Sequence, residues 1–240
     1  MSAETAGRST CATLPIIERE VVACRKCARL VEYREDVART KRRAYRDCEY
    51  WGRPVASFGD PEARLLVIGL APAAHGGNRT GRIFTGDRSG DFLFRALYET
   101  GFASQPESRS RDDGMALHGA FIAAAVRCAP PANKPLPEEF RNCRPYLERE
   151  LDALGRLEAV VALGRIAFDT YLSILRDRGA IRRRSEFRFG HGAAYTPVPG
   201  GPLLVASYHP SQQNTQTGKL TAEMLRDVFL VARRHIGRSA

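Results

Sequence analysis

The sequence predicts an α/β fold, a single-domain three-layer α/β/α sandwich with a central, mostly parallel, four-stranded sheet. Short apolar runs alternate along the chain with longer segments whose apolar residues recur at helical spacing. The alternation is typical of parallel strands that helices cover on both faces. The 240 residues suffice for one domain with a complete core. We place this domain at residues 16–240 and expect residues 1–15 to form a flexible N-terminal tail.

The individual elements follow from the same periodicity. Residues 16–47 have helical spacing and end in a basic cluster. Four strands and four further helices are expected in alternation, the strands at 64–70, 119–127, 158–163 and 203–207, and the helices at 90–101, 137–154, 164–177 and 219–236. Residues 103–114 have the composition of a mobile polar loop, and residues 181–201 that of a loop or hairpin.

Charge and hydropathy limit the partners and the compartment. Lys and Arg number 37 against 27 Asp and Glu, and the net charge of +10 indicates a polyanionic partner. A basic surface that only contacts water is the alternative. No apolar run is long enough to span a membrane, and the first residues, MSAETAGRSTCATLP, lack the layout of a signal peptide. We therefore expect a cytoplasmic protein with no membrane partner.

The most informative segment is residues 69–90, GLAPAAHGGNRTGRIFTGDRSG. It follows a predicted strand and contains six glycines, so its backbone can approach a ligand closely. Ligands of open α/β sheets bind at this end of the strands. The segment has neither the GxxxxGK[ST] nor the GxGxxG pattern, which argues against a nucleotide-phosphate loop. Phe84 and Asp87 lie within a few residues of each other in this polar loop.

Two other polar segments follow predicted strands. His209 lies in the segment 207–221, SYHPSQQNTQTGKLT, after the last strand, and Asn133 lies in the Pro-rich segment CAPPANKP after the second. The ends of parallel strands meet at one sheet edge, so these loops are expected to converge with residues 69–90. An amide in a rigid loop can read a base edge because it offers a donor and an acceptor. An Asn that caps a turn is the alternative for Asn133.

Six cysteines in a cytosolic chain need an explanation other than disulfides. Cys24 and Cys27 form a CRKC motif, Cys128 follows a predicted strand, and Cys143 lies near the start of a predicted helix. A close pair and two later thiols can surround one metal site. Zinc and an iron–sulfur cluster both accept this donor set, and a pair of ordinary buried thiols is the further alternative.

Taken together, residues 69–90, 119–145 and 203–220 resemble, in order, the three signature regions of the family 5 uracil-DNA glycosylases (UDGb). The resemblance implies the uracil-DNA glycosylase fold and a 4Fe–4S cluster. It assigns the cluster to four cysteines, Cys24, Cys27, Cys128 and Cys143. Cys11 and Cys48 receive no role.

The resemblance also implies the residues around the base. Phe84 would stack on the flipped base, and His209 would face its carbonyl. Asp87 would be the catalytic carboxylate, facing the scissile bond from the side opposite His209. Three further residues would border the base, Ala71, Asn133 and Ser211.

Two positions bear on the choice of base. The turn after the first strand reads GLAP, with Ala71 where many related glycosylases have a polar residue, and this is itself the family 5 pattern. Ala124 stands where the iron–sulfur relatives of family 4 have a base-reading Asn. Smaller side chains make a roomier and less selective pocket.

The implied function is base excision repair. A monofunctional hydrolase would release uracil, and other deaminated bases such as hypoxanthine and xanthine, from double-stranded DNA with the damaged base flipped out. The resemblance fits a monomer in the cytoplasm of a bacterium or archaeon, associated with the nucleoid. The alternatives are a basic iron–sulfur protein that binds nucleic acid without hydrolysis and an iron–sulfur redox protein. A covalent-trapping relative would carry an Arg-Arg-Ile-His insertion, which residues 82–92 lack.

Overall fold

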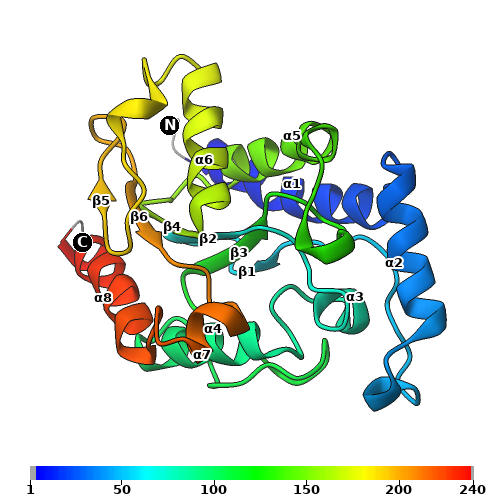
Figure 1. Cartoon of the computed structure of the whole chain (residues 1–240). Helices are drawn as coiled ribbons and strands as arrows, with labels where there is room; N and C mark the ends of the chain where they lie inside the picture. Colours follow the sequence, from blue (N-terminus) through cyan, green and yellow to red (C-terminus); the bar gives the residue numbers. More distant parts are fainter. Residues whose placement is uncertain (1–3, 239–240) are drawn as a thin grey trace.

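The computed structural model describes residues 4–238, with side chains from residue 13 to residue 237. Its centre is a six-stranded sheet in the order β1-β3-β2-β4-β6-β5 (Figure 1). The strands are β1 Phe58–Gly59, β2 Leu65–Gly69, β3 Ala120–Ala124, β4 Ala159–Leu163, β5 Ala194–Tyr195 and β6 Leu203–Ser207. The four inner strands are parallel and are the four that the sequence predicts, whereas β1 and β5 pair antiparallel at the two edges.

The parallel strands lie in matched register. Leu65 of β2 pairs with Ala120 of β3 and with Ala159 of β4, which in turn pairs with Leu203 of β6. Strands of equal length in this register end at one edge of the sheet. Every polar loop that follows a central strand therefore begins at that edge, which is where ligands bind in parallel sheets.

Helices cover both faces of the sheet (Figure 1). The helices are α1 Glu4–Val22, α2 Ala28–Thr40, α3 Gly77–Thr80, α4 Arg88–Glu99, α5 Pro137–Ala153, α6 Arg165–Asp177, α7 Gln212–Gln216 and α8 Ala222–Arg238. Short 3-10 turns occur at Arg43–Tyr45, Pro131–Asn133 and Arg184–Glu186. Helices α4 and α8 pack on the face of Leu65 and Val67, and helices α1, α5 and α6 on the face of Leu66 and Ile68. The predicted three-layer sandwich is confirmed.

The N-terminal region differs from the expected single helical stretch over 16–47. Helix α1 ends at Val22, and helix α2 begins only at Ala28. Cys27 precedes α2 in an extended conformation, with φ of −107°, which no α-helix accommodates. The interruption thus falls on the CRKC motif, so Cys24 and Cys27 lie outside the two helices.

The boundary expected at residue 15 lies within α1, which runs from Glu4. Leu14 and Ile17 of this helix are buried in the core. The division into a flexible tail and a domain stays a prediction, and residues 1–3 of that tail lie outside the described residues. No helix in the described range 4–238 combines the length and apolarity that crossing a membrane requires.

Candidate active site

A pocket opens at the edge where the parallel strands end. Leu70 follows β2, Leu163 ends β4, and His209 follows β6, and all three line this pocket. We call it the His209 pocket. Two of the loops predicted to converge, those after β2 and β6, therefore do so, and residues 189–190 close another side.

His209 is fixed by its own loop and lies against Phe84. Its carbonyl oxygen accepts a hydrogen bond of 2.9 Å from Nδ2 of Asn214, at the start of α7. The rings of His209 and Phe84 have centroids 6.0 Å apart and are tilted by 32°. Burial lowers the pKa of His209 to about 4, so the imidazole is neutral at pH 7. A neutral imidazole can still donate its N–H to an acceptor on a ligand.

Phe84 has an unusual backbone that two glycines make possible. Its φ is +53°, in the left-handed region that bulky residues rarely adopt. A Cβ on Gly69 would lie 2.8 Å from the Phe84 ring, and a Cβ on Gly90 would lie 1.7 Å from its carbonyl oxygen. Gly69 and Gly90 thus leave the space that the ring and the backbone of Phe84 occupy at the end of β2.

Asp87 occupies the N-cap of α4. Its Oδ1 accepts a hydrogen bond of 3.0 Å from the Gly90 amide, and a Cβ on Gly76 would lie 1.9 Å from its Oδ2. Burial raises the pKa of this carboxyl, while the hydrogen bonds from the Gly90 and Ser89 amides oppose the shift.

The cavity that Asp87 lines is not the His209 pocket. Arg79, Arg88, Arg95 and Arg109 border it, together with Asp91 and Glu107. Asp87 and His209 are therefore not brought together around one pocket in this structure. The expectation that the two groups face one bond from opposite sides stays a prediction.

Three other predicted base-contacting residues have different surroundings. Asn133 is exposed in the turn after β3, where it and Ala132 both have a positive φ. Ser211 caps α7, because its Oγ accepts a hydrogen bond of 3.4 Å from the Asn214 amide. Ala71 packs beside the apolar cluster that includes Cys128 and Cys143. None of the three is among the described residues that line the His209 pocket.

The four predicted ligand cysteines all line a second, more enclosed cavity, which we call the cysteine cavity. It is narrow, with a volume of about 10 Å³ accessible to water, and its thiols are those of Cys24, Cys27, Cys128 and Cys143. All four are free thiols, and burial raises the pKa of Cys128 to about 12 and that of Cys143 to about 11. Within residues 4–238, no three His, Cys, Asp or Glu side chains have the arrangement of a site for one metal ion.

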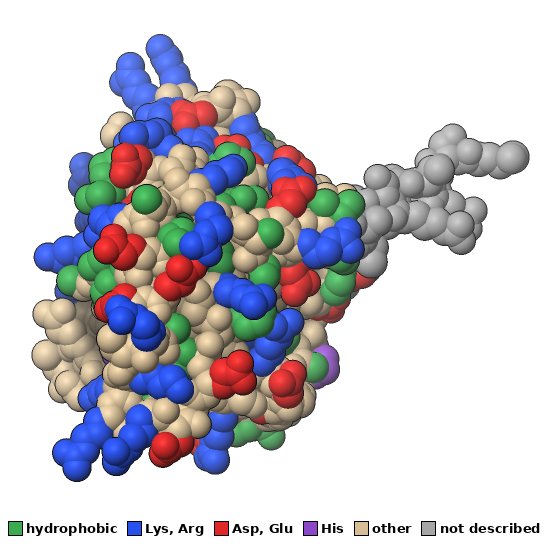
Figure 2. Space-filling view, turned by 90° about the vertical axis from the view of Figure 1, so that its right-hand side faces the viewer, with side chains coloured by type: hydrophobic (Ala, Val, Ile, Leu, Met, Phe, Trp, Pro, Cys, Tyr) green, Lys and Arg blue, Asp and Glu red, His purple; other side chains and the backbone are tan. Residues whose placement is uncertain are grey.

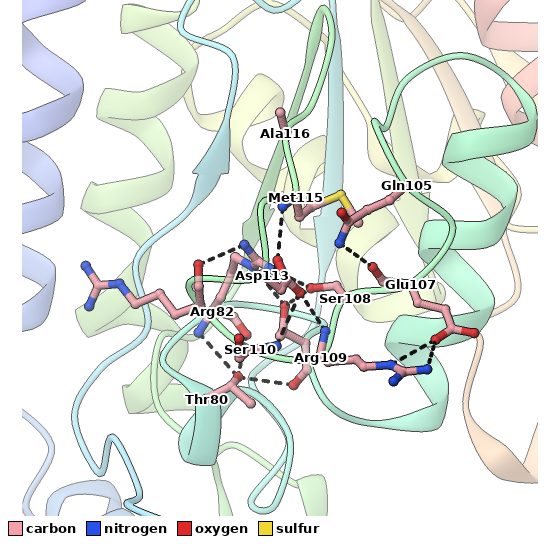
Figure 3. Close-up of polar contacts among 12 residues, drawn as sticks. Thr80, Arg82, Gln105, Glu107, Ser108, Arg109, Ser110, Asp113, Met115 and Ala116 are labelled. Carbon is pink, nitrogen blue, oxygen red and sulfur yellow. Dashed lines mark hydrogen bonds and ion pairs between the residues drawn. The ribbon is translucent and has the colours of Figure 1, made fainter.

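The polar loop 103–114 is tied to the glycine-rich segment by one buried arginine (Figure 3). Arg82 is 5% exposed and donates to Oγ1 of Thr85 at 3.1 Å, to Oγ of Ser108 at 2.6 Å and to a carboxylate oxygen of Asp113. Asp113 also accepts from three backbone amides of its own loop. We call these four side chains the Arg82 network. The loop expected to be mobile is thus hydrogen-bonded to the segment that holds Phe84.

Two charged residues and two aromatic residues of the His209 pocket received no role from the sequence, although Tyr208 and Lys219 belong to the polar segment 207–221. Lys219 lies over the ring of Tyr208 at 4.9 Å, and Arg165 lies over the ring of Phe189 at 5.0 Å. Arg165 lies two residues after a predicted strand, and this position could have indicated that it lines the pocket. Nothing in the local sequence distinguishes Phe189 from a core aromatic residue.

Comparison with known proteins gives a consistent result. Residues 56–232 match the model of the uracil DNA glycosylase superfamily. The chain is 54% identical over 217 residues to a type-5 uracil-DNA glycosylase of Thermus thermophilus, covering 90% of this chain and 95% of that protein. It is 46% identical to a type-5 enzyme of Mycobacterium leprae, covering 94% and 96%. It is 48% identical to one of Pyrobaculum aerophilum, covering 87% of each.

Proposed function

The chain belongs to the uracil DNA glycosylase superfamily, and we propose that it is a monofunctional uracil-DNA glycosylase that hydrolyses the N-glycosidic bond of uracil in double-stranded DNA. The product is an abasic site, and the process is base excision repair. The observation that carries this proposal is the contact of Phe84 with His209 at the strand edge, which pairs an aromatic face with a hydrogen-bond donor.

The reaction begins with extrusion of the base. A base within a duplex is out of reach of a side chain, and flipping it costs a few kcal/mol, least when it is mispaired. Stacking on an aromatic face returns about 1–3 kcal/mol per base. Phe84 offers such a face with its ring immobilised against Gly69. Uracil opposite guanine is a mismatch and is therefore a favourable substrate.

Cleavage separates charge between the sugar and the base. The sugar becomes cationic and the uracil leaves as an anion. His209 donates a hydrogen bond to the base oxygen on which the negative charge develops, in the manner of an oxyanion hole. Because its pKa is about 4, it does this as a neutral donor and does not transfer a proton to the base at pH 7. We therefore expect the contribution of His209 to base release to be independent of pH through the ordinary titration range of histidine.

Asp87 and its arginines suit the sugar–phosphate backbone. A carboxylate beside a cationic sugar stabilises it and can orient the attacking water. Arg88 and Arg109 border the same cavity and can bind the flanking phosphates. On the face shown in Figure 2, by contrast, Lys and Arg side chains alternate with Asp and Glu. We propose that the duplex binds along the strand edge, where these arginines lie, with Asn133 and Ser211 at its margin.

We also propose that Cys24, Cys27, Cys128 and Cys143 hold a 4Fe–4S cluster. In such a cluster each thiolate binds a different iron, so the sulfurs surround a volume instead of meeting at one point. Four thiols around one enclosed cavity fit this requirement. Held by these four residues, a cluster would cross-link the CRKC turn, the loop after β3 and helix α5. No step of the hydrolysis passes through it.

The substrate range is proposed to extend to hypoxanthine and other deaminated bases. Ala124 ends β3 beside Gly69 and is 1% exposed, and its methyl group offers no hydrogen bond to a base edge. Ala71 offers none from the neighbouring turn. The remaining features that we propose are a monomeric state and association with the nucleoid.

The experiment that tests the function is single-turnover base release from a duplex with one uracil. His209→Ala is expected to slow release by about 10²–10³-fold, the usual effect of removing one donor to a developing oxyanion. Duplex affinity should stay nearly unchanged, because phosphate contacts dominate binding. A second duplex with hypoxanthine in the same position reports the substrate range.

The matched control is His118→Ala, since His118 is exposed in the chain segment before β3. This variant should retain the parent rate. Equal losses of binding and release in His209→Ala would instead identify a structural histidine. A parent protein that binds the uracil duplex without releasing any base would support the alternative of a DNA-binding protein.

A further inference from the structure

Arg34 of helix α2 is a buried cation in the wall of the cysteine cavity. Its side chain is 2% exposed, and its Nη1 donates to the Sγ of Cys128 at 3.0 Å. Its other contacts are weaker. Nη1 and Nη2 reach the carbonyl oxygen of Cys24 at 3.4 Å, and Nη2 lies 3.7 Å from Oε1 of Glu35.

These contacts leave the charge of Arg34 incompletely balanced. Glu35 is 45% exposed and is shared with Arg25, to which it is closer at 2.5 Å. Nε of Arg34 is a buried atom with no hydrogen-bond partner among residues 4–238. A buried guanidinium is stable only beside a negative group that is also buried. The carboxylate beside Arg34 is the exposed and shared Glu35, which is not such a group, so the site calls for an anion in the cavity itself.

A thiolate-ligated iron–sulfur cluster is an anion of this kind, and its negative charge would lie beside the Arg34 guanidinium in the cysteine cavity. We propose that Arg34 is the counter-ion of the cluster and sets its reduction potential through the charge-assisted hydrogen bond to Cys128. The proposal rests on the proposed cluster. A positive donor on a ligand sulfur stabilises the reduced, more negative cluster more than the oxidised one, and so raises the potential.

Asn142 provides an internal comparison. Its Nδ2 donates to the Sγ of Cys27 at 3.3 Å, a longer hydrogen bond than that of Arg34. Asn142 is also neutral and only half-buried. Hydrogen bonds from charged donors are roughly twice as strong as neutral ones. Arg34 should therefore contribute the larger part of the effect, and Asn142 the smaller part in the same direction.

The test is a spectroelectrochemical titration of the cluster-loaded full-length chain, after its iron and sulfide have been measured. Arg34→Met should shift the midpoint potential to a more negative value. Asn142→Ala should shift it in the same direction by less. Arg34→Lys, which keeps the charge but not the fork geometry, should lie between the parent and Arg34→Met and also provides a measurement if Arg34→Met loses its cluster.

Arg39→Met is the control for the loss of one positive charge. Arg39 lies on the same helix, is 79% exposed and pairs with Asp36, away from the cavity. Arg39→Met should leave the midpoint potential of the cluster unchanged. A loaded Arg34→Met or Arg34→Lys protein with the parent potential would overturn this inference and leave the cluster proposal intact. A parent protein without iron and sulfide would overturn both.

Discussion

Arg82 and Arg34 are both buried guanidinium groups that join distant parts of the chain, but only one of them is balanced by the protein. Arg82 donates to two hydroxyls and a carboxylate, and the carboxylate of Asp113 is itself bound by backbone amides. Arg34 has a thiol, a distant carbonyl and a carboxylate that it shares. The Arg82 network is complete as the chain folds, whereas the surroundings of Arg34 become complete only with a further negative group.

The difference separates two uses of a buried charge. A network that closes on itself stabilises a local structure, here the loop that borders the glycine-rich segment (Figure 3). A buried charge that faces a cavity stabilises a bound ligand of opposite charge. Without that ligand, the same charge destabilises the fold. Removal of the proposed cluster should consequently change the effect of substituting Arg34 and leave the effect of substituting Arg82 unchanged.

Arg82→Met is expected to have the largest effect on stability. It leaves Asp113 half-buried without its cation, and breaking a buried ion pair costs about 3–5 kcal/mol. The loss should be the same with and without iron, because no part of the Arg82 network borders the cysteine cavity. Urea unfolding of both forms measures it. A loss that disappears in iron-free protein would show that the two regions are coupled.

Arg34→Met in iron-free protein should have a smaller effect of the opposite sign. Replacing an incompletely balanced buried ion by an apolar side chain is often neutral or stabilising by about 1–4 kcal/mol. In cluster-loaded protein the same substitution should lower the free energy of unfolding. The measurement is the unfolding midpoint of both variants before and after iron removal. Destabilisation of the iron-free form would mean that Arg34 is balanced by the protein after all.

The smallest expected effect is a pH dependence of the Arg82 network. The Arg82 guanidinium and three backbone amides hold the pKa of Asp113 below its ordinary value, against the opposing effect of burial. The unfolded chain therefore binds this proton first, so stability is complete above the ordinary Asp range. It declines as the pH falls through that range toward the folded-state pKa. Comparison of unfolding curves between pH 6 and pH 3 with those of Asp113→Asn isolates this contribution, and identical pH dependence in the two proteins would exclude it.

The sequence predicts the sheet well because its strands are apolar on both faces. The apolar run at 64–70 and the helical spacing at 137–154 match β2 and α5 within a residue or two. The edge strands β1 and β5 are two residues long, too short for any periodicity. The break between α1 and α2 was missed because the apolar spacing continues across the CRKC motif, while Cys24 and Cys27 lie at the cysteine cavity through contacts with segments distant in sequence.

The site was predictable in part, for a related reason. His209 and Phe84 were expected near each other because both follow strands that end at one edge, and the structure confirms this contact. The separate cavity of Asp87 was not foreseen, since the direction of a side chain at an N-cap depends on the helix that it caps. Arg82 and Asp113 are 31 residues apart in sequence, and no local pattern indicates their pairing.

The close packing of the Phe84 ring on Gly69 limits which substitutions can alter the base specificity of this enzyme. A Cβ at position 69 would collide with the Phe84 ring, so this side of the proposed base site cannot be remodelled by substituting Gly69. Directed evolution toward larger or differently shaped bases must instead work through residues that line the His209 pocket outside the buried core, such as Ile166, Phe189 and Lys219. A library confined to those three positions should yield altered specificity, whereas one that includes Gly69 should return glycine at that codon.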